Sequence, residues 1–164
     1  MKPQYLLLVG LFVSCTTTRN ITPKDSKGKI EFKSIEKFNG DTIAYNVYNF
    51  IDRKNLFIGK PASLILDNIN YEIKSYLYAT DLDGKIFGIY IFPYTRKKRI
   101  QLESKKVPYV NLIVEFNQKI PFDSLLDIYP QGRIENFDWS LTLKDFFGKY
   151  KVGNVKQLDR NNNK

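Results

Sequence analysis

The stretch that decides the fold is "YEIKSYLYATDLDGKIFGIYIF", residues 71–92. Its first part, Tyr71 to Thr80, alternates apolar side chains between two sides, which is typical of a β-strand. Asp83-Gly84 is a strong signal for a tight hairpin turn. The second part, Lys85 to Phe92, is apolar on both faces and therefore predicts a strand in the middle of a sheet. Together these segments predict an antiparallel β-hairpin.

Two further segments extend the predicted sheet. Tyr150 to Val155 predicts an edge strand. The stretch "VPYVNLIVEF", residues 107–116, predicts a third strand whose apolar residues share one face: Val110, Leu112, Val114 and Phe116.

Helical patterns flank these strands. Asp41 is a good N-cap for a helix from Thr42 to about Lys54, and Pro61 suits the first turn of a second helix. After the sheet, "PFDSLLDIY" (residues 121–129) and "WSLTLKDFFGKYKV" (residues 139–152) predict two short helices, the second capped by Ser140 or Thr142. The predicted class is α+β, with a helical hairpin followed by an antiparallel meander of three to four strands and one or two C-terminal helices.

The composition indicates one packed domain. The chain has 164 residues, of which 43% are hydrophobic, including 12 phenylalanines and 11 tyrosines. We expect a single domain over residues 30–157 and a disordered tail over residues 158–164.

The start of the chain has the pattern of a targeting signal. Lys2 precedes an uncharged run from Tyr5 to Val13. This run is shorter than the roughly 20 apolar residues that a membrane-spanning helix needs, but it suits the apolar part of a secretory signal. The run leads into Phe12-Val13-Ser14-Cys15, and Cys15 is the single cysteine of the chain.

This ending resembles the lipobox of bacterial lipoproteins. The resemblance implies that residues 1–14 are a signal peptide and that Cys15 is lipidated on its thiol and acylated, for instance with palmitate, on its new amino group. The polar residues 15–29 then form a tether between lipid and domain. The alternative is a buried signal-anchor or core strand with a chance cysteine, against which the polar tract from Thr16 argues.

The same resemblance implies a location in the bacterial cell envelope. Thr16 replaces the aspartate that retains some lipoproteins at the inner membrane, so we expect an anchor in the outer membrane. The order of the predicted elements also resembles the small outer-membrane assembly lipoproteins and the beta-lactamase-inhibitor-like proteins. That likeness concerns the fold alone and implies no functional residue.

Several classes of chemistry are missing from the sequence. The chain contains no histidine, which removes histidine-activated nucleophiles and the commonest transition-metal ligand. With Cys15 lipidated, no thiol remains for catalysis or for a disulfide. We therefore predict no catalytic residue, no metal site and no cofactor.

Two acidic patterns have structural explanations. Asp81 and Asp83 belong to a fragment that is similar to a calcium loop, but the other ligands are missing, so a hairpin turn is favoured. Asp123 and Asp127 could share one helix face and act as an acid and base pair, but Asp123 also suits the first turn of a helix.

The basic segment "YTRKKRIQLESKK", residues 94–106, lies between two predicted strands and predicts a long hairpin loop. Its cations could contact an anionic surface such as anionic lipid, or could simply solvate the loop. Nucleic acid is not expected as a partner of an exported lipoprotein. The residues of this candidate contact are Arg96, Lys97, Lys98, Arg99, Lys105 and Lys106.

These observations predict a lipid-anchored envelope protein that acts as a non-enzymatic binding or assembly module. Its partners beyond the membrane are then anionic lipid, a glycan or another envelope protein, and exposed tyrosines could supply the aromatic contacts. Two alternatives remain open. One is a carboxylate-based hydrolase of cell-wall glycan, and the other is an inhibitor or immunity-type lipoprotein that uses the basic segment.

Overall fold

A computed structural model describes residues 30–107, 109–129 and 137–160 and, for residues 159 and 160, the backbone alone. The predicted signal peptide, Cys15 and the tether lie outside the described residues, as does the end of the predicted tail from residue 161.

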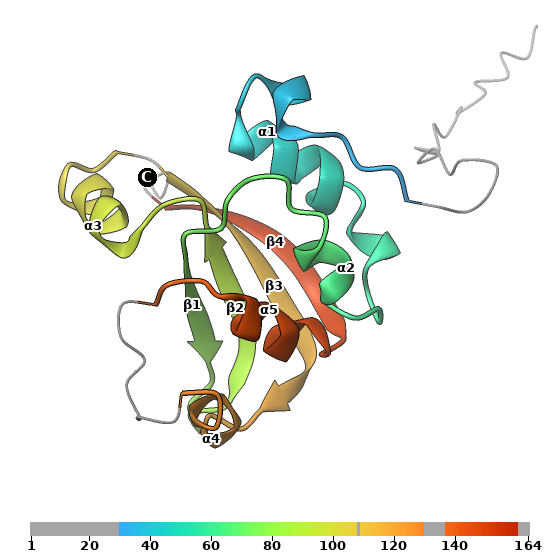
Figure 1. Ribbon diagram of the computed structural model, residues 1–164, viewed down its shortest axis with the longest axis vertical. Coiled ribbons are helices and arrows are strands. Elements are labelled where there is room, and N and C mark those ends of the chain that lie inside the picture. The colour runs from blue at the N-terminus through green and yellow to red at the C-terminus, as the bar shows by residue number, and fades with distance from the viewer. Residues whose placement is uncertain (1–29, 108, 130–136, 161–164) are drawn as a thin grey trace, which may run out of the picture.

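Four antiparallel strands form one sheet in the order β1-β2-β3-β4, so that neighbours in sequence are neighbours in space (Figure 1). This arrangement confirms the α+β class and the meander. The strands are β1 (Ser75–Thr80), β2 (Ile86–Phe92), β3 (Tyr109–Ile120) and β4 (Val152–Arg160). β4 therefore includes the first three residues of the predicted tail.

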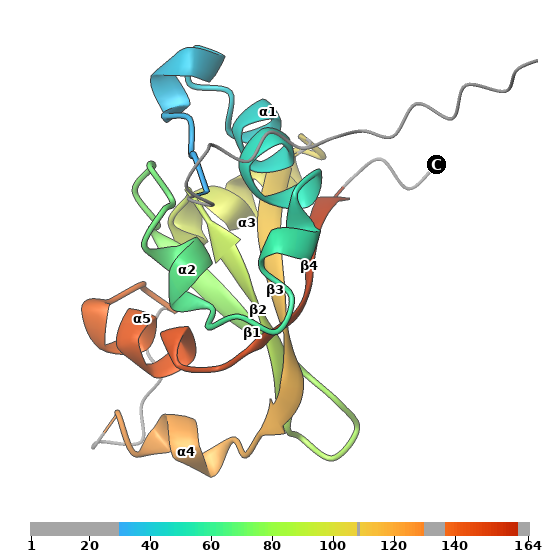
Figure 2. The same ribbon diagram turned by 90° about the vertical axis from the view of Figure 1, so that its right-hand side faces the viewer.

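Short helical elements surround this sheet. Figure 2 shows α1, α2 and α5 on the same side of it, while α3 connects β2 to β3 and α4 lies at the far end. The elements are η1 (Ile35–Phe38), α1 (Thr42–Asn46), η2 (Val47–Ile51), η3 (Lys54–Leu56), α2 (Ser63–Leu66), α3 (Arg96–Ser104), α4 (Asp123–Leu126) and α5 (Leu141–Gly148). Among the described residues, no helix combines the length and the apolar character needed to cross a bilayer.

The β1–β2 hairpin forms as the sequence predicts, although β1 begins at Ser75 and not at Tyr71. One carboxylate oxygen of Asp81 accepts the backbone N–H groups of Asp83 and Lys85, over 3.0 and 2.9 Å. Gly84 adopts φ 72°, a conformation that residues with a Cβ rarely take. The turn chemistry thus fixes the register of the two strands.

The helix-covered face of the sheet holds the core. Strand register places Tyr76, Ile91 and Leu112 in one row across it, and all three are fully buried. On the opposite face, Leu77 and Tyr90 lie in one row and are only partly buried. β2, predicted to be central, lies between β1 and β3.

The N-terminal helical segments are shorter than predicted, because the run of α1 and η2 ends at Ile51 and Pro61 lies before α2. Asp41 Oδ1 accepts the N–H groups of Ile43 and Ala44, over 2.8 and 3.1 Å, and so starts the helical run of α1 and η2. α2 packs on α5, where a Cβ added to Gly148 would lie 3.2 Å from the Cβ of Ser63. The predicted hairpin of two packed N-terminal helices stays a prediction, because the contacts of α2 are to a helix from the other end of the chain.

Residues 30–34 form a strap that precedes η1 and lies on the body of the domain. Asn49, fully buried, accepts the N–H of Lys33 over 2.9 Å and donates to its carbonyl over 3.0 Å. Arg53 Nη1 donates to the carbonyl of Glu31, and the ring of Phe32 packs 6.0 Å from that of Phe50. The strap is therefore fastened through both its backbone and its apolar side chain.

Candidate functional site

The basic segment is a helix and not the loop that the sequence predicts. Thr95 Oγ1 caps the start of α3 by accepting the N–H of Lys98 over 3.3 Å. At the other end, Lys106 N–H donates to the Glu103 carbonyl and Val107 N–H to the Leu102 carbonyl, over 3.0 and 2.9 Å. This pair of bonds is a Schellman motif, which closes a helix with a residue in the left-handed conformation.

Arg99 is not part of the exposed cluster, which corrects the sequence prediction for this residue. Its side chain is buried, with 5% of the residue exposed. The guanidinium lies 4.3 Å from the centre of the Phe92 ring on β2. Arg99 therefore attaches α3 to the sheet through a cation–π contact and through the apolar part of its side chain.

A second contact holds the inner side of α3. The hydroxyl of Tyr109, on β3, donates to a carboxylate oxygen of Glu103. Tyr109 is itself buried and packs against the rings of Phe92 and Tyr94, with centroids 6.2 and 6.5 Å away. Arg99 and Glu103 therefore both attach the inner side of α3 to the sheet.

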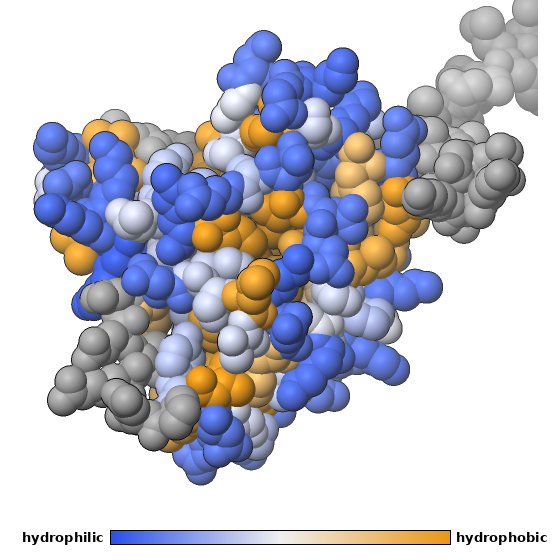
Figure 3. All heavy atoms as spheres, viewed as in Figure 1, coloured by the Kyte–Doolittle hydropathy of each residue, from blue (hydrophilic) through white to orange (hydrophobic). Residues whose placement is uncertain are grey.

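The other side of α3 faces outward and is strongly basic. We call its exposed cations the basic patch: Arg96, Lys97, Lys98, Lys105 and Lys106. Ile100 and Val107 lie in the same surface with 52% and 42% of their area exposed. Figure 3 shows hydrophobic spots within the hydrophilic surface over α3.

A shallow hollow of about 490 Å³ adjoins this surface. Its lining combines the start of α3 with the carboxylate of Asp138. The guanidinium of Arg96 also lies 5.7 Å from the centre of the Phe137 ring. One carboxylate beside several cations suits the binding of a charged group better than acid–base catalysis, which needs a tuned pair.

The predicted acid pair does not gather in a cleft. Asp123 begins α4 and Asp127 follows its end, and both residues are exposed. Asp123 lies in the first turn of α4, as the sequence predicts, while the N-cap position itself is occupied by Phe122. Three hollows in the described part of the chain have at most one carboxylate each in their lining, Asp138 beside α3 and Asp67 beside the strap.

Three of the ten tyrosines in the described ranges are buried and the other seven are half-buried, and two of these, Tyr78 and Tyr90, line a shallow hollow beside β1 and β2. Tyr45 and Tyr76 are fully buried, and desolvation raises the pKa of both hydroxyl groups. Burial also raises the pKa of Tyr71, whose hydroxyl donates to Asn46 over 3.2 Å. These phenols remain protonated at neutral pH, so they are poor candidates for general bases.

Asp81 and Asp83, the fragment similar to a calcium loop, lie in the turn of the β1–β2 hairpin. Asp81 pairs with Lys119 over 2.7 Å, in addition to the two backbone bonds of the hairpin. In the described ranges, no group of three or more acidic, histidine or cysteine side chains could hold a metal ion. Cys15 lies outside those ranges.

Three features of the site escape a sequence analysis. The helical state of α3 is signalled by Thr95 as a cap and by Arg99, Leu102 and Glu103 at helical spacing, but a charged residue is rarely read as an inward position. The exposure of Ile100 has no signal, because apolar residues are usually buried. The strap depends on a buried asparagine whose partners are backbone groups 16 residues earlier.

No known protein family, no curated protein and no solved structure matches this chain. The site is therefore interpreted from its own residues and geometry.

Proposed function

We propose that this protein is a lipid-anchored component of the bacterial cell envelope, held in the outer membrane through Cys15, and that its α+β domain is a non-enzymatic binding or assembly module. The observation that carries the proposal is the lipobox-like Phe12-Val13-Ser14-Cys15 at the end of a short apolar run. A lipidated first residue with several acyl chains is a stable anchor, whereas one chain binds only marginally.

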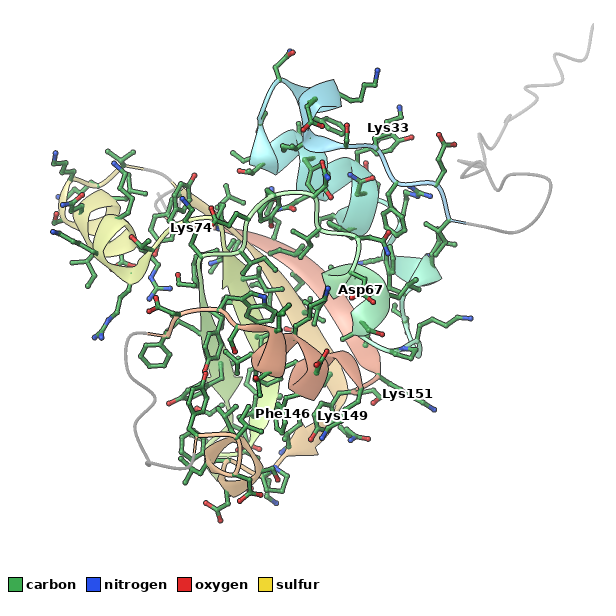
Figure 4. The ribbon with its side chains drawn as sticks, viewed as in Figure 1. Lys33, Asp67, Lys74, Phe146, Lys149 and Lys151 are labelled. Atoms are coloured by element: carbon green, nitrogen blue, oxygen red, sulfur yellow. The ribbon has the colours of Figure 1, made fainter. Side chains whose placement is uncertain are left out.

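The strap supports this proposal. A domain on a lipid tether experiences any pull from the membrane at the residues that follow the tether. In this protein those residues are held by Asn49 and Arg53, which bond the backbone of Lys33 and Glu31. Figure 4 shows Lys33 in the strap, at the edge of the domain.

The length of the tether fits a domain that works at the membrane surface. Residues 15–29 can span at most roughly 50 Å when fully extended, at about 3.3 to 3.6 Å per residue. This reach is larger than the thickness of a small domain, so any side of the domain can turn toward the bilayer. The tether alone therefore does not decide which surface makes contact.

The described geometry favours binding over catalysis. The acidic residues that could form a catalytic pair lie apart from the hollows, and the buried tyrosines have raised pKa values. No observation on the structure favours the glycan hydrolase. The basic patch suits an acidic partner. Both the binding module and the inhibitor-type alternative would have such a partner.

The test is fatty-acid labelling of the full chain and of Cys15→Ser in a Gram-negative host. We expect the wild type to be processed, to take up labelled palmitate and to fractionate with the outer membrane, and we expect the variant to remain an unlabelled precursor. Equal labelling of both forms would overturn the lipid anchor, and a wild type found only in the inner membrane would overturn the outer-membrane location.

A further inference from the structure

The exposed positions of α3 depart from what helix stability favours. Its first turn contains Arg96, Lys97 and Lys98 and no acidic residue. The helix dipole makes this end favourable for anions and unfavourable for cations. Three consecutive cations at this position therefore oppose the stability of the helix to which they belong.

The end of α3 shows a second departure. Lys106 has φ 52°, in the left-handed region. In a Schellman motif this position is usually glycine, because a Cβ is disfavoured there. A lysine at this position supplies an exposed cation but leaves the backbone in a conformation that is disfavoured for a residue with a Cβ.

A third departure is the exposure of Ile100 and Val107, which are 52% and 42% exposed. Ile100 follows Arg96 by four positions and therefore lies beside it on the outward side of the helix. Exposure of large aliphatic side chains to water is unfavourable. An environment with negative charge and an apolar layer would stabilise both the cations and the aliphatic side chains between them.

All three departures have the same result: they place cations, with aliphatic residues among them, on the exposed surface of α3. Such departures from local rules concentrate at functional sites. We propose that the outward surface of α3, with the basic patch, Ile100 and Val107, binds the anionic headgroup region of a lipid bilayer. This inference rests on the proposed function, because the lipid anchor keeps the domain beside such a surface.

The chemistry of the contact follows from the side chains. Lysine ammonium groups donate to lipid phosphates as compact charges, and their apolar stems extend along the surface. Ile100 and Val107 reach into the boundary between headgroups and acyl chains, as the apolar residues of interfacial helices do. The buried Arg99 and the hydrogen bond between Tyr109 and Glu103 hold the helix to the sheet and so orient its outward side.

The experiment uses the chain from residue 15 onward with Cys15→Ser, so that no lipid tethers it. Its binding is measured by sedimentation with phosphatidylcholine vesicles that contain or lack phosphatidylglycerol, and urea unfolding establishes that every variant is folded. The patch variant is Lys97→Ser, Lys98→Ser and Lys105→Ser. The matched control, Lys54→Ser, Lys60→Ser and Lys151→Ser, removes three exposed lysines elsewhere, and Figure 4 shows Lys151 on the opposite side of the molecule from α3.

We expect the wild type to prefer the anionic vesicles. The patch variant should lose affinity by on the order of 100-fold at low salt, since each of its three removed cations contributes about a fivefold step near an anionic surface. The control variant should stay close to the wild type. Higher salt should weaken the wild type steeply and the patch variant little, because exposed charges are screened.

Lys106→Gly gives a sharper readout. Glycine suits the left-handed position, so this variant should unfold at higher urea concentration than the wild type while binding anionic vesicles several-fold more weakly. Stronger folding with weaker binding would show that the lysine serves the contact and not the helix.

Three outcomes would overturn the proposal. One is equal binding of the patch variant and the control variant to anionic vesicles. Another is equal affinity of the wild type for vesicles with and without phosphatidylglycerol. The third is tighter binding to a single-stranded oligonucleotide than to the vesicles, which would assign the patch to nucleic acid. Because the chain under test carries no lipid, none of these outcomes depends on Cys15.

Discussion

Neighbouring residues of α3 have opposite roles, and Arg99 and Lys98 show this most clearly. Arg99 is buried against the ring of Phe92, whereas Lys98 is exposed. Charge and position in the sequence do not distinguish them. The distinction comes from the side of the helix on which each lies, and therefore from the aromatic ring that one of them meets.

This contrast gives the first prediction. Arg99→Ser should lower the free energy of unfolding by about 2 kcal/mol or more, because it removes a desolvated cation–π contact and the packing of the side-chain stem. Lys98→Ser should change it by no more than about 0.5 kcal/mol, as exposed substitutions usually do. Urea unfolding of both variants checks the prediction, and equal losses would contradict the inward placement of Arg99.

Single residues also explain where sequence analysis succeeds and where it fails. The side chains of Asp41, Asp81 and Ser140 accept backbone N–H groups within four residues, so their roles follow from local chemistry. Arg99 and Asn49 act on groups that only the folded chain brings close. From the sequence alone, a charged or amide side chain is expected to be exposed, because its buried partner is not known.

Among the elements, the β1–β2 hairpin is the most strongly specified. Its turn is held by the carboxylate of Asp81, which accepts two backbone N–H groups and pairs with Lys119 of β3. The ion pair with Lys119, together with these backbone bonds, holds the pKa of Asp81 below its usual value. The turn therefore links β1, β2 and β3 through one charge.

This charge makes the stability of the domain depend on pH. Because the folded-state pKa of Asp81 is lowered, its contribution is complete above the unfolded-state pKa of about 3.9 and is lost as the pH falls through the lower folded-state value. The difference in free energy of unfolding between the wild type and Asp81→Asn should thus be largest at neutral pH and shrink in acid.

Urea unfolding at a series of pH values from neutral to acid measures this difference. Asp83→Asn is the matched control, because Asp83 lies in the same turn without accepting these bonds through its side chain. A difference between the wild type and Asp81→Asn that stays constant down to the lowest pH would show that the charge of Asp81 does not stabilise the hairpin.

The elements differ in how far their sequence determines them. β2 is apolar on both faces and follows an Asp-Gly turn, and this combination favours a central strand. α3 has few apolar residues and a basic first turn, so neither an apolar periodicity nor the helix dipole indicates a helix. Two tertiary contacts hold it on the sheet: the guanidinium of Arg99 lies over the ring of Phe92, and Glu103 accepts the hydroxyl of Tyr109.

At the scale of the whole molecule, we propose that the sheet domain has two connections to the membrane. One is the tether, which joins the body at the strap. The other is α3, which lies on another side of the domain from the strap (Figure 1). Because the two connections are separate, the fastening of the strap and the binding of α3 can be tested independently.

The strap gives a prediction at this scale. Asn49→Ala should leave the N–H and carbonyl of Lys33 without their partner and destabilise the domain by about 1 to 3 kcal/mol. The backbone amide of Lys33 should also exchange its hydrogen much faster than in the wild type. Asn55→Ala, which changes an exposed asparagine nearby, should do neither.

Hydrogen exchange measured residue by residue separates this local effect from global unfolding. If the Lys33 amide in Asn49→Ala stays as protected as in the wild type, the strap is held by other contacts and the fastening role of Asn49 is wrong.

The most direct test of the central claim, the lipid anchor, is the intact mass of the mature protein extracted from bacterial membranes. We expect a chain that begins at Cys15 and carries a diacylglycerol and a further acyl chain on that residue. A chain that begins at Met1, or one that begins after residue 15 without added lipid mass, would contradict it.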